Sequence, residues 1–599
     1  MSPLLTTNFY DTANRYSAKA ALKEKVNGVY RSITYQEMKE RVEQVAVFLL
    51  DSGLDAGDRV ALLSENRSEW PIMDMGIISA GLVNVPIYPT LTSSQIAYIL
   101  NDSGSKGVVV SNTDQLDKIR ACLKDCPHVA WVICLDNCPE DLDFKNVKLI
   151  SYKNLLVEGE RLMQTKRSEL EARLQLAKSS DMVSIVYTSG TTGNPKGVML
   201  SHMNFASNAI SAAEAMGFNY NQTSLSFLPL SHVLERVVHY VMQYCGATIA
   251  YAESIDTLGD NLQEVKPSAF VAVPRVFEKI YARILQSVQN DKPLKRKIFY
   301  WALDVGKQAS AYTTQGKSMP PALAAKHTLA DKLVFSKIRA RTGGNLEFAV
   351  SGGAPLMKEL AEFFFAVGIN IYEGYGLTET SPVICINRPK HVKLGTVGQA
   401  IQDVEVKIAE DGEILARGPN IMHGYFNNPT ATAEVLNQDG WFHTEDIGEL
   451  DSEGYLKITD RKKEIVVMSN GKNVAPQPVE NKLKTSPYIE QAVMVGDNQK
   501  YMAALIYPDY ESLGRLAKAE GIKADSPESM AQSEHIRAIL RKEIDQLTQD
   551  FARYEQIKKF ALLTEELTQE NDCLTPTLKL KRRVIRKKYE SLINSLFES

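Results

Sequence analysis

The chain has 599 residues, which is too long for one ordinary hydrophobic core and predicts two or more domains. Its 44% apolar and 23% charged residues are typical of a globular protein and argue against a disordered one. The net charge of −4 argues against general nucleic-acid binding, so we expect no nucleic-acid partner.

The N-terminal segment MSPLLTTNFYDTANRY has no basic region followed by an apolar run, so we expect no secretory signal. The longest uncharged stretch, residues 75–100, is interrupted by Asn84, Pro86 and Pro89. These residues favour a buried βαβ crossover over a membrane span. We therefore expect a cytoplasmic protein, with peripheral contact to the cytoplasmic face of a membrane left open.

Apolar strand-like runs alternate with helical patterns through the first 450 residues. The expected strands cover residues 57–63, 82–88, 106–111, 182–190, 247–254, 269–274 and 346–353, and the expected helices include residues 69–81 and 93–104. This alternation is typical of parallel sheets covered by helices, so the predicted fold class is α/β. Most of the runs end in Gly, Ser or Pro, and ligands gather at the carboxyl ends of such strands.

The cysteine spacing leaves two interpretations open. Four of the seven cysteines form CLKDC (122–126) and CLDNC (134–138), which could indicate a zinc site. However, the three-residue gaps are not the usual tight knuckle, and WVICLD is typical of a buried strand. The odd number of cysteines favours reduced thiols.

The pattern changes after residue 446. The segment GELDSEGYLKITDRKKEIVV has the turn spacing of short antiparallel strands, and a helix is expected near Pro478, before a strand at IEQAVMVG. We predict a large N-terminal domain, residues 1–459, and a small mobile α+β domain, residues 460–599. The joint at residues 459–463 is short, so it permits rotation about a few backbone angles and not free diffusion on a tether.

The segment YTSGTTGNPKG, residues 187–197, has the composition of a phosphate-binding loop. Its glycines let the backbone approach an anion, its hydroxyls donate hydrogen bonds, and Lys196 supplies charge. A Walker loop requires a second glycine where Pro195 stands, and Ser or Thr where Gly197 stands. The spacing therefore excludes the P-loop switches and motors.

YTSGTTGNPKG resembles the signature of the adenylate-forming superfamily of acyl-CoA synthetases, luciferases and adenylation domains. Further motifs follow in the family's order: SFLPLSHVLER (226–236), SGGAPL (351–356), YEGYGLTET (372–380), GWFHTEDIG (440–448), DRKKEIV (460–466) and LTPTLKLKR (574–582). The resemblance covers nearly the whole chain. It implies an enzyme that uses ATP, Mg²⁺ and, as a co-substrate, coenzyme A.

The resemblance also assigns residues to the nucleotide site. In the family the loop holds the β- and γ-phosphates, Tyr375 stacks on adenine, Thr378 holds the α-phosphate, Glu379 binds Mg²⁺ and Asp446 binds the ribose. The full set implied for ATP and CoA is Thr188, Ser189, Gly190, Thr191, Thr192, Gly193, Lys196, Gly352, Gly353, Ala354, Glu373, Gly374, Tyr375, Gly376, Thr378, Asp446, Ile458, Arg461, Gly471 and Lys579.

By the same resemblance, Lys579 is the catalytic lysine, and Lys581 is its nearest rival. A carboxylate attacks the α-phosphorus, so an ammonium group between the two anions stabilises the transition state. Lys579 belongs to the small domain and must swing in for adenylation and out for thioester formation. Asp460 corresponds to the family hinge, and Gly471 would then permit a narrow pantetheine tunnel.

The acid itself is indicated by two segments. His232 resembles the family's acyl-site gate, and AVPRVFEKIY (272–281), followed by a long helical insertion, resembles the long-chain fatty acyl-CoA synthetases. The insertion, residues 281–342, carries twelve Lys/Arg and three Asp/Glu, a local charge of +9. It could bind anionic lipid or form a solvated arm with its aromatic residues packed inward. The basic segment 579–588 is a second candidate for membrane contact.

The leading hypothesis is an ATP-dependent, AMP-forming long-chain fatty acid–CoA ligase. One alternative is a fatty acyl-AMP ligase that delivers to a carrier protein, and another is a ligase for a different hydrophobic carboxylic acid. A non-catalytic lipid-binding protein of the same fold is disfavoured by the presence of Lys196, Glu379, Asp446 and Lys579. The sequence leaves the oligomeric state open, with a homodimer among the options.

Overall fold

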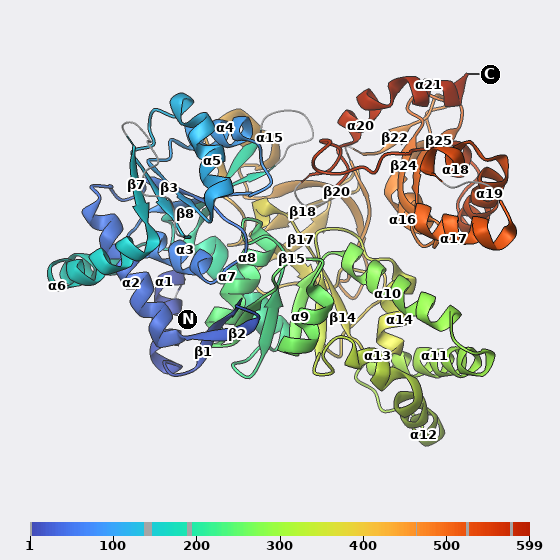
Figure 1. Ribbon diagram of the computed structural model, residues 1–599, viewed down its shortest axis with the longest axis horizontal. Helices are drawn as coiled ribbons and strands as arrows, with labels where there is room; N and C mark the ends of the chain where they lie inside the picture. Colours follow the sequence, from blue (N-terminus) through green and yellow to red (C-terminus); the bar gives the residue numbers. More distant parts are fainter. Residues whose placement is uncertain are drawn as a thin grey trace.

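The computed structural model describes residues 3–136, 147–188, 195–462, 464–522, 526–575 and 579–598. Figure 1 shows a large body and a smaller one, drawn in orange and red, that carries the C-terminus. The two bodies meet above helices α10 and α14.

In the described part of the large body, eight strands form the first sheet, in the order β19-β9-β8-β4-β3-β5-β6-β7. Their bounds are β3 Arg59–Leu63, β4 Val83–Ile87, β5 Gly107–Val110, β6 Trp131–Cys134, β7 Lys148–Ser151, β8 Met182–Thr188, β9 Lys196–Ser201 and β19 Gly424–Tyr425. From β8 to β7 the neighbours are parallel, whereas β9 and β19 add an antiparallel edge. The predicted strands of this region are confirmed.

Nine strands, counted over the same described residues, form the second sheet, in the order β16-β15-β14-β13-β12-β10-β11-β1-β2. The bounds are β1 Ala20–Val26, β2 Val29–Thr34, β10 Thr223–Ser226, β11 Thr248–Tyr251, β12 Ala269–Ala272, β13 Phe348–Ser351, β14 Ile371–Gly376, β15 Val383–Ile386 and β16 Gln399–Ala400. The middle of this sheet is parallel, and β2, β15 and β16 are antiparallel edges.

Helices fill the space between the sheets and cover their outer faces. Val60 and Leu62 of β3 share a core with Ile249 and Tyr251 of β11, whereas Ala61 faces the opposite side of its sheet. The helices in this shared core are α1 Leu5–Arg15, α2 Tyr35–Asp51, α3 Glu69–Ser79, α6 Tyr152–Leu176, α7 His202–Met216 and α8 Val233–Tyr244. Helices α4 Ser93–Ser103 and α5 Thr113–Cys122 cover the first sheet. Helices α9 Leu258–Val265 and α14 Lys358–Ala366 cover the second.

A buried ion pair lies within the shared core. The Arg236 guanidinium on α8 donates to both carboxylate oxygens of Asp74 on α3, at 2.6 and 3.2 Å, and to Ser184 on β8 at 2.6 Å. Arg236 is 0% exposed and Asp74 is 1% exposed. Because a buried charge is stable only when it is paired, this pair fixes α8 against the first sheet.

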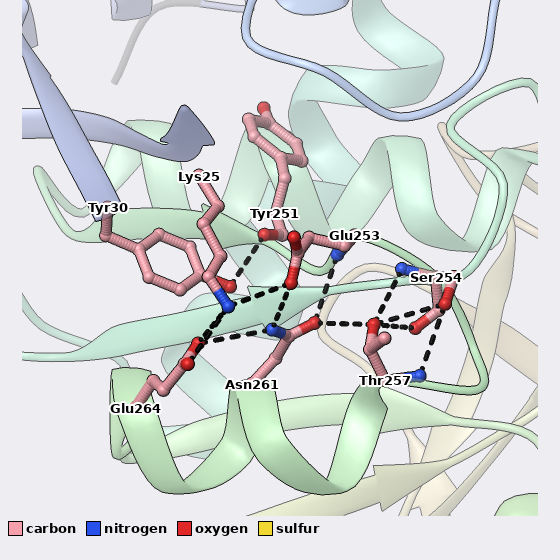
Figure 2. Close-up of polar contacts among 8 residues, drawn as sticks. All are labelled: Lys25, Tyr30, Tyr251, Glu253, Ser254, Thr257, Asn261 and Glu264. Carbon is pink, nitrogen blue, oxygen red and sulfur yellow. Dashed lines mark hydrogen bonds and ion pairs between the residues drawn. The ribbon is translucent and has the colours of Figure 1, made fainter. Parts of the chain in front are cut away.

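The N-terminal hairpin β1–β2 is held at the edge of the second sheet by a polar cluster (Figure 2). The Lys25 ammonium donates to Glu253 and to Glu264, each at 2.9 Å. The Asn261 amide donates to the same two carboxylates, and the Tyr30 hydroxyl donates to the Tyr251 carbonyl. The cluster therefore joins the hairpin to β11 and α9.

A further antiparallel sheet, in the order β17-β18-β20-β21, precedes the small body. Its strands are β17 Glu405–Ile408, β18 Glu413–Arg417, β20 Phe442–Leu450 and β21 Leu456–Arg461, and α15 Pro429–Val435 lies beside it. The predicted change to antiparallel strands is correct, although it begins at β17, earlier than we expected. The reason is that β17 pairs with β18 and β18 pairs with β20, which extends this sheet into the large body.

The small body has its own core, whose buried members lie between Val466 and Leu596. Its strands are β22 Val466–Val467, β23 Asn473–Val474, β24 Ile489–Val495, β25 Met502–Pro508 and β26 Ile557–Leu562. Its helices are α16 Pro476–Leu483, α17 Tyr510–Glu520, α18 Pro527–Gln532, α19 Glu534–Thr548, α20 Arg582–Lys588 and α21 Glu590–Phe597. A separate core is consistent with the proposed division after residue 459.

The basic insertion forms a helical arm that projects from the large body in Figure 1. It comprises the end of α10 Pro274–Gln289, then α11 Pro293–Thr313, α12 Pro321–Ala330, a π-helical turn over Asp331–Phe335 and α13 Ser336–Ala340. Among the described residues, every helix is too short or too polar to span a bilayer.

The cysteines agree only in part with the expected reduced thiols. Cys122, Cys126, Cys245, Cys385 and Cys573 are free. Cys134 is disulfide-bonded, so the expectation is wrong at that position. The cysteine spacing does not indicate this disulfide. Cys134 ends the buried strand WVIC, which the sequence predicts correctly. Cys138 lies outside the described residues.

Candidate active site

The ends of the phosphate loop are fixed by an antiparallel pair of strands. Thr188 ends β8 and Lys196 begins β9, and the two residues are paired across the ladder. A Cβ atom on Gly197 would lie 2.7 Å from the Ile185 side chain, so only glycine fits there. The predicted loop residues Ser189, Gly190, Thr191, Thr192 and Gly193 lie outside the described residues.

Tyr425 joins the loop lysine to the predicted metal ligand. The Lys196 ammonium lies 4.8 Å from the centre of the Tyr425 ring, a cation–π distance. The Tyr425 hydroxyl donates to the Glu379 carboxylate at 2.8 Å. Burial raises the pKa of Tyr425 most, and the charge of Glu379 raises it further. The hydroxyl therefore stays protonated and can donate. Tyr425 thus contacts both Lys196 and Glu379, which belong to separate motifs.

Asp446 lies at the edge of the same site. Its carboxylate accepts from the Tyr375 hydroxyl at 2.8 Å and lies 3.3 Å from Nε of Arg461. β20 pairs with β21 so that Asp446 stands opposite Arg461. Burial raises the pKa of Asp446, and Arg461, Tyr375 and Lys579 act against that rise. The structure thus brings these predicted residues together from three motifs.

Two glycine-rich segments, SGGAPL and YEGYG, approach each other. Gly352 follows β13, and a Cβ atom there would lie 3.3 Å from Leu234 and 3.9 Å from the Gly374 carbonyl oxygen. Gly353 has φ +79°, a conformation that favours glycine, and Ala354 is exposed. A Cβ on Gly376 would lie 1.7 Å from the Pro382 carbonyl oxygen. The close backbone approach explains the small residues of both motifs.

Glu373, which stands opposite Ser351 in the β13–β14 pair, is 7% exposed. Burial raises its pKa to about 8, against the lowering effect of the Leu356 backbone amide. Thr378 and Glu379 follow in a short 3₁₀ turn, Thr378–Thr380, at the end of β14. The predicted residues of YEGYGLTET therefore lie at the carboxyl end of a strand, where ligands gather in such sheets.

His232 is the N-cap of α8, and its Nδ1 accepts from the Leu234 backbone amide at 3.2 Å. Burial lowers its pKa to about 3, with Lys579 adding to the effect, so the imidazole is neutral at ordinary pH. Leu234, two residues on, packs against Gly352. His232, the expected acyl-site gate, thus lies two residues from a side chain that packs against the SGGAPL segment.

Lys579 of the small body is exposed and lies near the same site. Desolvation lowers its pKa, and Arg461 lowers it further, whereas Asp446, Glu464 and Glu379 raise it. Its backbone is held by two hydrogen bonds to Thr575. By contrast, the rival Lys581 pairs with Asp572. The acidic surroundings of Lys579 therefore favour it over Lys581, and its catalytic role stays a prediction.

The hinge residues lie between the two bodies. Asp460 belongs to β21, and burial raises its pKa to about 6. Lys462 is anchored to the large body through Asp411 and Glu413, at 2.6 and 3.2 Å. Ile458, also on β21, pairs with Gly448. Gly471, with φ +78°, is exposed at the tip of the β22–β23 hairpin, and the proposed CoA tunnel stays a prediction.

Tyr425 is the functional candidate that sequence reasoning missed. It lies in IMHGYFNN, which has none of the charge or glycine pattern of the other motifs. Only the pairing of β19 with β9 brings it beside Lys196.

Comparisons with known proteins identify the family of the chain. A family model described as AMP-binding enzyme matches residues 9–426, and one described as AMP-binding enzyme C-terminal domain matches residues 463–599. The chain belongs to the AMP-binding enzyme family. The predicted family is thereby confirmed.

The enzyme is 36% identical over 577 residues to the long-chain-fatty-acid–CoA ligase FadD15 of Mycobacterium bovis, with 96% of this chain and 93% of the relative covered. It is 32% identical to the peroxisomal long chain acyl-CoA synthetase 6 of Arabidopsis thaliana, with 95% of this chain and 82% of the relative covered.

Among solved structures, the adenylation domain of a carboxylate reductase from Mycobacterium chelonae superposes with a TM-score of 0.79 at 20% identity, covering 99% of the enzyme and 91% of that chain. ATP-bound MatB from Rhodopseudomonas palustris gives a TM-score of 0.68 at 22% identity, covering 99% and 100%. These likenesses confirm the predicted fold class.

Proposed function

We propose that the enzyme is a long-chain fatty acid–CoA ligase that works through an acyl-adenylate. The observation that carries this proposal is that Lys579 of the small body lies near Asp446 and Glu379 of the large body: desolvation lowers the pKa of Lys579, and the charges of these two carboxylates act to raise it. Lys579 and Arg461 supply positive charge beside the carboxylates of Asp446 and Glu379. Positive charge at this place suits a reaction in which two anions meet. The full-length similarity to long-chain-fatty-acid–CoA ligases supports the substrate class.

In the first step a fatty acid carboxylate oxygen attacks the α-phosphorus of ATP. A new P–O bond forms, the bond to the β-phosphate oxygen breaks, and pyrophosphate leaves. Lys196 and the loop hold the departing phosphates, Asp446 holds the ribose, and Tyr375 and the glycine segments border the adenine. Lys579 stabilises the charge that builds between the carboxylate and the α-phosphate, an effect worth about 3–4 kcal/mol for one well-placed group.

Glu379 fits a magnesium ligand in this site. It presents a carboxylate beside the phosphate loop, and Mg²⁺ is commonly bound by one or two carboxylates together with substrate phosphates. The Tyr425 hydroxyl orients that carboxylate. When bound, the ion neutralises phosphate charge, as it does in other phosphate-transfer sites.

In the second step the sulfur of CoA attacks the acyl carbon, the bond to the AMP oxygen breaks, and AMP leaves as the thiol loses its proton. Because Lys579 acts in the first step, we expect the small body to rotate about a hinge at Asp460 before the second step. The segment around Gly471 then faces the acyl-adenylate. No nucleophilic side chain is required, because CoA supplies the attacking group.

The proposal is tested by product analysis with ATP, Mg²⁺, CoA and palmitate. We expect AMP, pyrophosphate and palmitoyl-CoA in equal amounts. Formation of ADP would contradict adenylation. Palmitoyl-AMP without palmitoyl-CoA would instead support the acyl-AMP ligase, and activity confined to other hydrophobic acids would contradict the long-chain assignment.

The helical arm supports peripheral contact with an anionic membrane face in the cytoplasm, from which fatty acid can be drawn. Near the start of α11, Lys292, Lys295, Arg296 and Lys297 are all exposed. Leu294 is 69% exposed and Tyr300 53% exposed beside them, whereas Phe299 packs inward. Exposed apolar residues among bases are typical of an interfacial helix.

The C-terminal basic segment is a weaker candidate than the sequence indicated. Arg582 is bound by Glu464 and Glu480, Arg586 pairs with Asp497, and Lys588 pairs with Glu565. These acidic partners neutralise much of the charge that the segment would offer to lipid. We therefore assign membrane contact to the arm and not to residues 579–588.

Reversing the charges of Lys295, Arg296 and Lys297 should weaken binding to vesicles that contain anionic lipid, while binding to neutral vesicles stays weak. The matched control reverses Lys153, Arg161 and Arg167 on α6, at the opposite end of the molecule (Figure 1). Equal losses in the two triple variants would show a general charge effect and would contradict a docking role for the arm.

A further inference from the structure

Two ion pairs far from the hinge join the small body to the large one among the described residues. Arg275 at the start of α10 lies 2.7 Å from Glu490 on β24. Lys482 on α16 lies 2.8 Å from Glu359 on α14. We call these four residues the latch. Figure 1 shows α10 and α14 directly below the small body, which is where the latch lies.

One helix of the large-body half of the latch, α10, begins beside the SGGAPL glycines. Arg275 follows Val273 by two residues, and a Cβ on Gly353 would lie 3.6 Å from Val273. α10 and α14 are locked together by aromatic contacts, with the rings of Tyr281 and Phe363 4.7 Å apart. The latch is therefore attached to the wall that carries the SGGAPL glycines.

Near the other end of α10, the small body makes one more contact. With its amide turned to face the guanidinium, the Gln286 oxygen accepts from Arg515 at 3.0 Å. α10 thus meets the small body near both of its ends, and in the same orientation Lys579 lies near the charges of Asp446 and Glu379.

We propose that the latch is the positioning device that holds the small body in the orientation in which Lys579 enters the nucleotide site. This inference rests on the proposed two-step function, in which that orientation serves adenylation and is left for thioester formation. Arg275, Glu490, Glu359 and Lys482 are positioning residues, because they act through the placement of Lys579 and touch no reacting atom.

The strength of the pairs suits a contact that opens in every catalytic cycle. The side chains of Arg275 and Glu490 are 32% and 31% exposed, and those of Lys482 and Glu359 are 28% and 63% exposed. Water screens such pairs, so each one favours the closed orientation only modestly. Reversing one charge replaces attraction with repulsion, and we expect a loss of adenylation of about fivefold, which corresponds to about 1 kcal/mol.

The test separates the two half-reactions. Adenylation is followed by palmitate-dependent exchange of pyrophosphate into ATP, and thioester formation by the conversion of supplied palmitoyl-AMP and CoA into palmitoyl-CoA. Arg275→Glu and Glu490→Arg should each lower the exchange about fivefold and leave thioester formation unchanged or faster. The double variant, in which the charges are swapped, should recover most of the exchange.

The second pair provides an independent check that does not depend on the fold of the first variants. Lys482→Glu should show the same division between half-reactions, and Glu359→Lys combined with it should restore exchange. Arg161→Glu, which reverses one exposed charge within α6, is the matched control and should change neither half-reaction.

Equal loss of both half-reactions, or a swapped variant no better than the single ones, would overturn the latch. Unchanged exchange in all single variants would overturn it as well. Failure of the proposed function would look different, because the parent enzyme would then lack palmitate-dependent exchange altogether.

Discussion

The position of Tyr425 leads to a prediction about magnesium binding at Glu379. Replacing it with Phe keeps the ring beside Lys196 and removes the hydroxyl that donates to Glu379 at 2.8 Å. A hydrogen bond to a charged group contributes about 1.5–3 kcal/mol. Glu379 is only partly buried, so water can replace some of this contribution. We expect a net loss of about 1–2 kcal/mol, or about 5- to 30-fold in kcat/KM for ATP.

The assay is palmitate-dependent ATP–pyrophosphate exchange measured over a range of Mg²⁺ concentrations. The Phe variant should require more Mg²⁺, since its carboxylate is less well oriented. Tyr425→Leu also removes the cation–π contact, worth about 0.5–2 kcal/mol, and should be slower again. A Phe variant with parental rate and Mg²⁺ dependence would refute the orienting role, and a Leu variant no slower than Phe would refute the contribution of the ring.

Two further predictions concern stability. Burial raises the pKa of Glu235, which is 3% exposed, to about 8, so the folded enzyme keeps a proton that the unfolded chain releases near pH 4.5. Stability should therefore fall as pH rises from 4.5 to 8. In urea unfolding, Glu235→Gln should gain up to about 5 kcal/mol over the parent across that window. Parallel pH profiles of the two proteins would contradict this. Arg236→Leu leaves Asp74 as an unpaired buried charge and should cost about 3–5 kcal/mol. Adding Asp74→Leu should recover part of that loss, and a larger loss in the double variant would contradict the pairing.

Much of the fold follows from local patterns in the sequence. Apolar runs that lead into glycine, serine or proline become β3, β4, β5, β8, β12 and β13, with bounds close to those predicted. The reason is that a buried parallel strand needs continuous apolar residues and a turn at each end, and both are local properties. The motifs likewise indicate Asp446, Glu379 and Lys579, which the structure brings together.

The remaining features depend on contacts between distant segments. Tyr425 lies beside Lys196 only because β19 pairs with β9, and no local pattern specifies that pairing. The Asp74–Arg236 pair joins residues on two helices of one core, and either residue alone resembles a surface charge. The sequence does not predict that β17 and β18 join the antiparallel sheet, because these segments carry no motif and β18 pairs with the distant strand β20.

The central claim is that Lys579 acts in adenylation and leaves the site for thioester formation. The most direct measurement compares Lys579→Ala with the control Lys581→Ala in the two half-reactions. Lys579→Ala should lose about 100-fold or more of the ATP–pyrophosphate exchange, as expected for a group worth about 3–4 kcal/mol. It should also convert supplied palmitoyl-AMP and CoA at nearly the parental rate, whereas Lys581→Ala should retain both activities. Equal loss of both half-reactions in Lys579→Ala, or a larger loss of exchange in Lys581→Ala, would contradict the account.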